Sequence, residues 1–380
     1  MSTTAPLAGT EAHPHARVVL SAGLASGSPS HAYLFHGPNG TGKARAARAL
    51  AAELLAEGDP DPESVRARVE TDSHPDLTWV RPTGAHVMRV DDVEEAVIGA
   101  ATRTPFEAAR RVFVLERVDT MNDEVANRML KTLEEPAHFV HLILLTDSIG
   151  RVLDTVKSRC QLVRFDPLPP AMLAASLAAE GIPDDRAAAS ARLALGNGDR
   201  ARLLASDEGL ALRAEAERMV RTALAGGGST PDDLQPWRGL LDRAEDRRRG
   251  VEEAAAEESE RMAGLAPKGR ERRAVERELE EAAKRDGRRA HTGIIELGLN
   301  LMGAAFRDLA CVAEGAPQAV LGMDVIEALG QAGAGRDAAA LRQAVELCDA
   351  TRQSLQQNVS EELALEALFY RLARLVGKPD

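Results

Sequence analysis

The chain has 380 residues, enough for two or three domains, and no apolar run approaches the roughly 20 residues that a membrane span needs. Its formal net charge of −12 argues against a protein that only binds nucleic acid, which would usually be basic. Aromatic residues make up 3% of the chain and the three cysteines are far apart, so we expect a core of Leu, Val and Ala, with reduced thiols. The first 14 residues lack a basic segment followed by an apolar one, which predicts a cytoplasmic location.

A glycine-rich loop stands between a predicted strand and a predicted helix near the N-terminus. A helix is predicted over Ala16–Leu24, the run His31–His36 is typical of a short buried strand, and another helix is predicted from Lys43 to about Glu57. The loop reads G-P-N-G-T-G-K, in which glycines let backbone N–H groups surround a phosphate while the helix N-terminus adds positive potential. The candidate phosphate-binding residues are Gly37, Gly40, Thr41, Gly42, Lys43 and Ala44.

The loop departs from the phosphate-binding pattern at its last position. That pattern places Ser or Thr after the lysine, because the hydroxyl binds Mg²⁺, and Ala44 offers no oxygen. The alternative interpretation is that residues 37–42 only turn a strand into a helix. The sequence therefore leaves two hypotheses open: a silent site for ATP or ADP, with Lys43 supplying the charge, or no nucleotide site.

Strands and helices alternate as far as residue 165. Further strands are predicted at Leu77–Val80, Arg111–Leu115, His141–Leu145 and Gln161–Phe165, with helices over Val90–Ala101 and Asn122–Glu135. This alternation predicts an α/β fold with a mostly parallel sheet and helices on both of its faces.

Two strand ends carry polar residues at the positions where a P-loop ATPase keeps its catalytic groups. Such an enzyme usually has an Asp that holds Mg²⁺ and an adjacent Glu that orients water, and this chain has Glu116 and Arg117 there. Glu116 is either a longer metal ligand or a solvated strand end, whereas Arg117 replaces the acid with a cation. Thr146 takes the position that senses the γ-phosphate. The changes at Ala44 and Arg117 together predict that this core does not hydrolyse ATP.

The most specific motif is T-V-K-S-R-C, which ends in Ser158-Arg159-Cys160. Together with the strand near residue 33, the glycine loop and N-R-M-L-K-T-L-E-E-P at 127–136, it resembles the clamp-loader subunits of bacterial DNA polymerase III, a family with an AAA+ P-loop core. The altered loop and strand end make the chain more similar to the delta-prime branch than to the ATP-hydrolysing gamma/tau branch. The resemblance implies that Arg159, flanked by Ser158 and Cys160, acts in trans as an arginine finger in a neighbouring subunit's ATP site.

The resemblance also implies a place in a larger complex. The expected partners are the gamma/tau and delta subunits and, through the complex, the sliding clamp and primer–template DNA; no membrane is expected. The expected function is that of a non-hydrolysing part of a DNA polymerase holoenzyme, helping to load the clamp onto primed DNA. The alternatives are a working AAA+ ATPase of gamma/tau type or a helicase-like protein, and a lone nucleic-acid binder, which the net charge disfavours.

No cofactor is required on this interpretation. Subunits of this family usually carry a four-cysteine zinc module between the loop helix and the stretch His74-Pro75-Asp76-Leu77. In this chain residues 55–73 contain neither Cys nor His, and zinc needs closely spaced thiolate or imidazole ligands. The sequence therefore predicts no zinc and no other metal.

The chain beyond residue 167 is predicted to be helical. We expect the AAA+ core over 1–167, a small helical lid over 168–206 and, by resemblance, an all-α collar that mediates oligomerisation over 207–380. In the lid, Asp199 stands where ATP-hydrolysing relatives have a basic residue, although a shift of one position places Arg200 there. The charged segment 242–290 is either an exposed helical hairpin or a partly disordered insertion. A last helix is predicted to begin with Ser360 as its N-cap.

Overall fold

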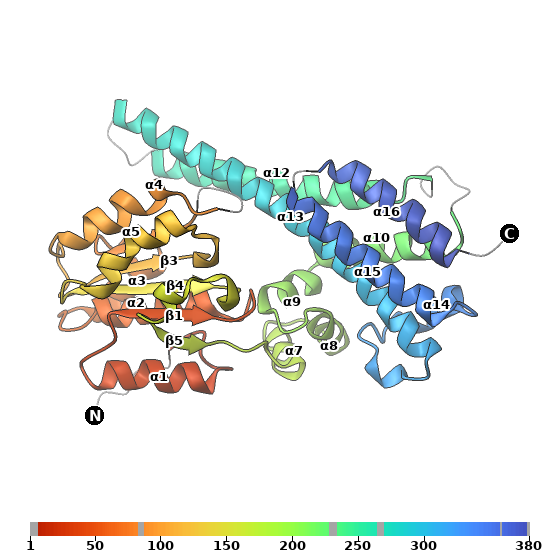
Figure 1. Cartoon of the computed structure of the whole chain (residues 1–380), viewed down its shortest axis with the longest axis horizontal. Helices are drawn as coiled ribbons and strands as arrows, with labels where there is room; N and C mark the ends of the chain where they lie inside the picture. The colour runs from red at the N-terminus through yellow and green to blue at the C-terminus, as the bar shows by residue number, and fades with distance from the viewer. Residues whose placement is uncertain (1–6, 83–86, 228–233, 264–269, 358, 378–380) are drawn as a thin grey trace. The chain divides into compact units, whose positions relative to one another are not determined.

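The computed structural model describes residues 7–82, 87–227, 234–263, 270–357 and 359–377 (Figure 1). The chain separates into two compact units. The first unit holds residues 1–173 and 195–200, and the second holds residues 174–194 and 201–380. The finer division into core, lid and collar stays a prediction.

A five-stranded parallel sheet forms the centre of the first unit. Its strands lie in the order β2-β3-β4-β1-β5, and every neighbouring pair is parallel. The strands are β1 (Ala32–His36), β2 (Leu77–Val80), β3 (Arg111–Leu115), β4 (Val140–Thr146) and β5 (Gln161–Arg164). All five coincide with predicted strands to within one residue at either end. The predicted α/β class with a parallel sheet is therefore confirmed.

Alternate residues of the strands face two separate apolar clusters. Tyr33 and Phe35 of β1 point to one face, whereas Leu34 points to the other, as the two-residue period of a strand requires. Helices lie on both sides of the sheet in Figure 1. The α-helices of this part are α1 (Pro14–Ala25), α2 (Lys43–Leu55), α3 (Pro62–Glu70), α4 (Val90–Val93), α5 (Asp123–Glu134) and α6 (Asp154–Lys157).

The helix predicted over residues 90–101 is less regular than expected. Only α4 is α-helical; a π-helical turn, Glu94–Gly99, and a 3₁₀ turn, Ala100–Thr102, continue it. Two β-branched residues followed by Gly99 weaken the regular helical bonding there. Val93 and Val97 are nevertheless both fully buried, so the segment still covers the sheet.

The described residues after β5 form helices and no strand. They include α7 (Pro170–Ala179), α8 (Asp184–Leu193), α9 (Gly198–Ala205), α10 (Asp207–Leu224), α12 (Arg238–Ala263), α13 (Arg270–Ala313), α14 (Ile326–Gly333), α15 (Ala338–Ser354) and α16 (Glu361–Val376). In the second unit, every one of these helices except α7 contributes to one apolar cluster, which includes buried Trp237, Phe306 and Phe369. As predicted, the Ser360 side chain accepts the Leu363 N–H at the start of α16. None of the helices in the described ranges is long and apolar enough to cross a membrane.

The charged segment 242–290 is helical wherever it is described. Its residues belong to α12 and to the first part of α13, which run side by side in Figure 1. Ion pairs within each helix, such as Arg248–Glu252 and Lys284–Glu280, satisfy part of the charge. The described residues of this segment are therefore helical, as the hairpin alternative expects. The expected tip, Pro267-Lys268-Gly269, lies outside the described residues.

Candidate functional site

The glycine loop connects β1 to α2, as predicted. Gly40 and Gly42 have φ values of +68° and +94°, a region that residues with a Cβ adopt at a cost. A Cβ on Gly37 would also lie 1.9 Å from the Phe165 carbonyl oxygen. The glycines are thus needed for the path of the backbone, whether or not a phosphate binds there.

The ammonium group of Lys43 is fully engaged by the loop and its surroundings. Its Nζ donates to the carbonyl oxygens of Gly37 at 2.6 Å and Pro38 at 2.7 Å, and lies 2.8 Å from an Asp147 carboxylate oxygen. The Lys43 side chain is buried, while Asp147 is partly exposed. In this arrangement the charge that the sequence assigned to a phosphate is neutralised by a carboxylate of the same chain.

Two other segments close over the loop. From the N-terminal side, the His13 ring donates Nε2–H to the Thr41 carbonyl oxygen at 2.7 Å, and burial lowers the pKa of His13 and so keeps its ring neutral. From the other side, the Gly198 N–H donates to the Gly40 carbonyl oxygen at 2.8 Å. The Asn197 amide lies so close to Gly40 that a Cβ there would clash with it. Residues far from the loop in the sequence therefore bind two of its carbonyl oxygens and pack against Gly40.

The strand-end residues are held in contacts of their own. The Glu116 carboxylate accepts the Trp79 Nε1–H at 2.6 Å and the Arg81 Nε–H at 3.2 Å, so it is bound to the β2 side of the sheet. Arg117 follows in the left-handed region, with φ +54°. Ala44 is exposed on the first turn of α2. These three positions, which would hold Mg²⁺ and water in an ATPase, supply one carboxylate, and that carboxylate is already paired.

Thr146 lies at the end of β4, next to β1, as expected. Its hydroxyl is buried, donates to Asp119 Oδ1 at 2.9 Å and accepts the Ser148 N–H at 3.0 Å. Asp119 was not among the predicted residues. The hydroxyl that was predicted to sense a γ-phosphate therefore already has hydrogen-bond partners within the chain.

Ser158, Arg159 and Cys160 follow α6 and precede β5. The guanidinium of Arg159 donates from Nη1 to the Thr155 carbonyl oxygen at 2.8 Å and to Ser158 Oγ at 3.2 Å, and its Nη2 pairs with Glu134 of α5. Cys160 packs against the apolar cluster that the sheet shares with α4 and α5, and burial raises the pKa of its thiol to about 12. The cysteine thus anchors the backbone while the arginine stays at the surface.

The residues of the glycine loop and the Ser158–Cys160 motif lie at opposite ends of the strands. Tyr33, near the start of β1, pairs with Gln161 at the start of β5, whereas His36 at the end of β1 leads into the glycine loop. Arg159 precedes Gln161 by two residues and so lies at the amino ends of the strands. The structure does not bring Arg159 to Lys43.

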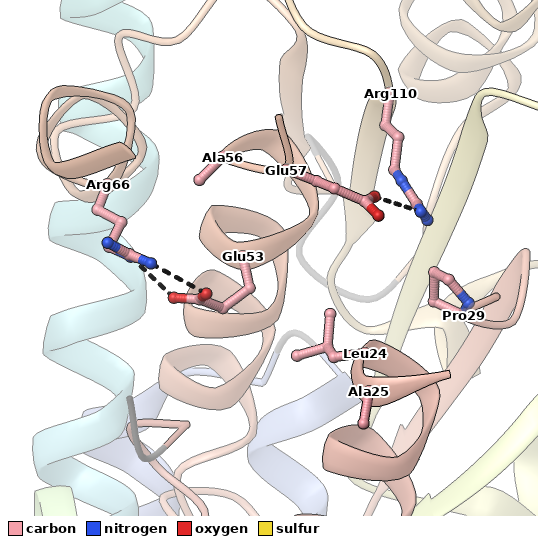
Figure 2. A pocket seen from close by; sticks show the side chains of 8 residues that line it. All are labelled: Leu24, Ala25, Pro29, Glu53, Ala56, Glu57, Arg66 and Arg110. Atoms are coloured by element: carbon pink, nitrogen blue, oxygen red, sulfur yellow. Dashed lines mark hydrogen bonds and ion pairs between the residues drawn. The ribbon is translucent and has the colours of Figure 1, made fainter. Parts of the chain in front are cut away.

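A surface pocket in the first unit is lined by other residues (Figure 2). Glu53 of α2 and Glu57, two residues after the end of α2, line it, and they pair with Arg66 and Arg110, respectively. Its apolar lining consists of Leu24, Ala25, Pro29 and Ala56. None of the predicted site residues is among those that line it, and both of its arginines are neutralised by carboxylates.

The stretch His74-Pro75-Asp76-Leu77 has a structural role that the sequence did not reveal. Asp76 is fully buried, and its carboxylate accepts the backbone N–H groups of Phe106, Glu107 and Ala108 at 2.7, 3.0 and 3.0 Å. The segment predicted to lack zinc ligands includes helix α3. No group of three or more potential metal ligands gathers in the ranges that the structure covers.

Comparisons with known proteins match the first part of the chain. Residues 12–169 fit the family model described as DNA polymerase III, delta subunit. The chain is 37% identical over 164 residues to DNA polymerase III subunit delta′ of Bacillus subtilis, covering 42% of this chain and 49% of that protein. It is 36% identical over 166 residues to the delta′ subunit of Pseudomonas aeruginosa, covering 42% and 50%.

A match to a gamma subunit is weaker. DNA polymerase III subunit gamma of Buchnera aphidicola is 29% identical over 150 residues, covering 38% of this chain and 41% of that protein. The predicted resemblance to the clamp-loader family, and to its delta-prime branch in particular, is thus confirmed for the first part of the chain. The chain spans about half the length of the two delta′ relatives.

Proposed function

We propose that the chain is a non-hydrolysing subunit of the DNA polymerase III clamp loader, which helps to load the sliding clamp onto primed DNA and donates Arg159 to the ATP site of a neighbouring hydrolytic subunit. Its partners on this proposal are the gamma/tau and delta subunits, and through them the clamp and primer–template DNA. The similarity of residues 12–169 to delta′ subunits supports the family role.

The observation that carries the non-hydrolysing part is the arrangement of the metal and water positions. Phosphoryl transfer to water needs Mg²⁺ on the phosphates and a residue that orients the attacking water. Ala44 has no oxygen, Glu116 is bonded to Trp79 and Arg81, and Arg117 is a cation. The ion pair of Lys43 with Asp147 further opposes nucleotide binding, so we propose that the loop is a structural remnant of a nucleotide site.

The role of Arg159 follows from charge and position. In the transfer of a γ-phosphoryl group, negative charge spreads over the equatorial oxygens, and a guanidinium stabilises it by binding two of them. Arg159 is 32% exposed and lies at the end of the sheet away from its own loop. These features suit a cation that acts on another chain.

A reconstitution tests both parts of the proposal. The chain, the gamma/tau subunit and the delta subunit of the same bacterium are combined, and ATP turnover and clamp loading are measured. Arg159→Ala should leave assembly intact and lower both rates. An arginine finger in trans can contribute roughly 10³–10⁵ in rate at its own site, and a ring with several sites loses less overall. Arg151→Ala, which removes another exposed arginine, is the matched control.

Two results would contradict the proposal. Equal rates for the unmodified and Arg159→Ala complexes would exclude the role in trans. Turnover by the isolated chain near the ~1–100 s⁻¹ of kinases, abolished by Lys43→Ala, would favour a gamma/tau-like ATPase instead. That alternative is supported by the retained lysine and by the similarity to the gamma subunit.

A further inference from the structure

Arg159 is bound by its own chain in a way that competes with the role proposed for it. Two of its three guanidinium nitrogens are in use: Nη1 donates to Thr155 and Ser158, and Nη2 pairs with the Glu134 carboxylate. An arginine binds a phosphoryl group through these same terminal N–H groups. The guanidinium cannot direct both terminal nitrogens at a phosphate while it keeps these partners.

Glu134 is an unusual residue for its place in α5. It is the last residue of the helix, where the helix dipole is negative and an acidic side chain is unfavourable. The ion pair with Arg159 offsets that cost, because it brings a cation to the same end of the helix. Helix propensity alone therefore does not explain why an acidic residue stands at the end of α5. A role of Glu134 in holding Arg159 would explain it.

The other two contacts of Arg159 are local. Thr155 belongs to α6 and Ser158 directly precedes the arginine, so both move with the short segment that carries it. Glu134 is the partner that ties the arginine to a different element. It is 46% exposed, so the pair is accessible to water and can be exchanged at a small cost.

We propose that Glu134 is a positioning residue that holds Arg159 folded against α5 until a neighbouring subunit's nucleotide replaces its carboxylate. This inference rests on the proposed function, because it names how the donated arginine is kept and released. The phosphate oxygens of the neighbour and the Glu134 carboxylate are competing anions for one guanidinium. Removing the carboxylate's charge makes the arginine easier to recruit.

The first test uses the isolated chain and does not depend on the complex. Glu134→Gln keeps the size of the side chain and removes its charge. Phenylglyoxal modifies accessible arginines, and peptide mass spectrometry measures its rate at Arg159. An exposed ion pair restrains its partners by a factor of about 1.5 to 5, so the rate should rise by that factor in Glu134→Gln. The control is Glu135→Gln, which changes the adjacent exposed carboxylate and should leave the rate unchanged.

The second test uses the assembled loader. Glu134→Gln should lower, by about 1.5- to 5-fold, the concentration of chain that half-maximally stimulates ATP turnover by the hydrolytic subunit. In the Arg159→Ala background the same substitution should have no effect, since there is no guanidinium to release. As a control, thermal unfolding of Glu134→Gln is compared with that of the unmodified chain. Equal unfolding temperatures show that the change in stimulation does not come from misfolding.

The outcomes separate this inference from the proposed function. If Arg159→Ala lowers turnover but Glu134→Gln behaves like the unmodified chain in labelling and in stimulation, the holding role is wrong and the arginine finger stands. If Arg159→Ala has no effect on turnover, the proposed function fails and the holding role fails with it. An equal effect of Glu134→Gln with and without Arg159 would also overturn the inference, because the carboxylate would then act through another residue.

Discussion

Asp76 is expected to be one of the most sensitive positions of the first unit. Its buried carboxylate accepts three backbone N–H groups from residues 106–108, and its own carbonyl oxygen accepts the Val112 N–H. It therefore fixes the loop that leads into β3, the strand that ends at Leu115, directly before Glu116. Asp76→Ala leaves those donors without their acceptor, whereas Asp76→Asn keeps one acceptor oxygen and turns an NH₂ group toward an N–H.

The expected decrease in the free energy of unfolding follows from the number of hydrogen bonds that Asp76 accepts. A hydrogen bond to a charged group contributes about 1.5–3 kcal/mol, and a buried donor left alone costs about 1–3 kcal/mol. The three donors lie in a partly buried loop, so water replaces some of the lost contacts. We expect Asp76→Ala to lower the free energy of unfolding of this unit by about 3–5 kcal/mol, and Asp76→Asn by about 2–3 kcal/mol.

The positions of the two tryptophans allow unfolding of the first unit to be measured separately from that of the second. Trp79 lies in the first unit and Trp237 in the second, so in a Trp237→Phe background fluorescence reports only on the first. Urea unfolding of both variants gives the free energies, with Asp91→Asn, an exposed carboxylate, as the control. A loss below about 1 kcal/mol, or one equal to that of the control, would refute the assigned role of the buried carboxylate.

Two further predictions concern titratable groups. The hydrogen bond to Glu361, with Glu245 of α12 nearby, raises the pKa of His291, so His291 contributes stability that is present below about pH 6.5 and is lost as the pH rises through its folded pKa. In urea unfolding, His291→Gln should make the free energy of unfolding fall less steeply as the pH rises. An unchanged dependence on pH would contradict this prediction. Burial holds the pKa of Cys160 near 12, so at pH 8 iodoacetamide should label it in urea but hardly in the folded chain, and equal labelling rates would argue against this.

The sequence predicted the strands because each one is a short apolar run next to turn residues. It also predicted the start of α16, since Ser360 is a strong local N-cap signal. The irregular turns at 94–102 were not predicted, because propensity does not distinguish a π-helical turn from an α-helical one. The charged segment 242–290 left two alternatives, since ion pairs within a helix and full solvation suit the same charges.

The sequence predicted which residues belong to the candidate site, but it did not predict which other residues their side chains contact. Asp147, which neutralises Lys43, directly follows the predicted Thr146, and its position after a strand end was the only local signal. His13 and Asn197 come from segments far away in the sequence, and their approach to the loop depends on tertiary packing. The ion pair of Arg159 with Glu134 joins two motifs, residues 127–136 and T-V-K-S-R-C, whose contact the sequence does not predict.

The direction of the strands explains why Arg159 would serve another chain. The loop with Lys43 follows the carboxyl end of β1, whereas Arg159 precedes the amino end of β5, the strand beside it. A five-residue strand is roughly 16 Å long, and a guanidinium must come within roughly 3 Å of a phosphoryl oxygen to stabilise it. The arginine could reach its own loop only if the sheet unfolded. On the proposed function, a chain without the metal and water residues but with this arginine would not hydrolyse ATP and would still have a cation to offer to a neighbour.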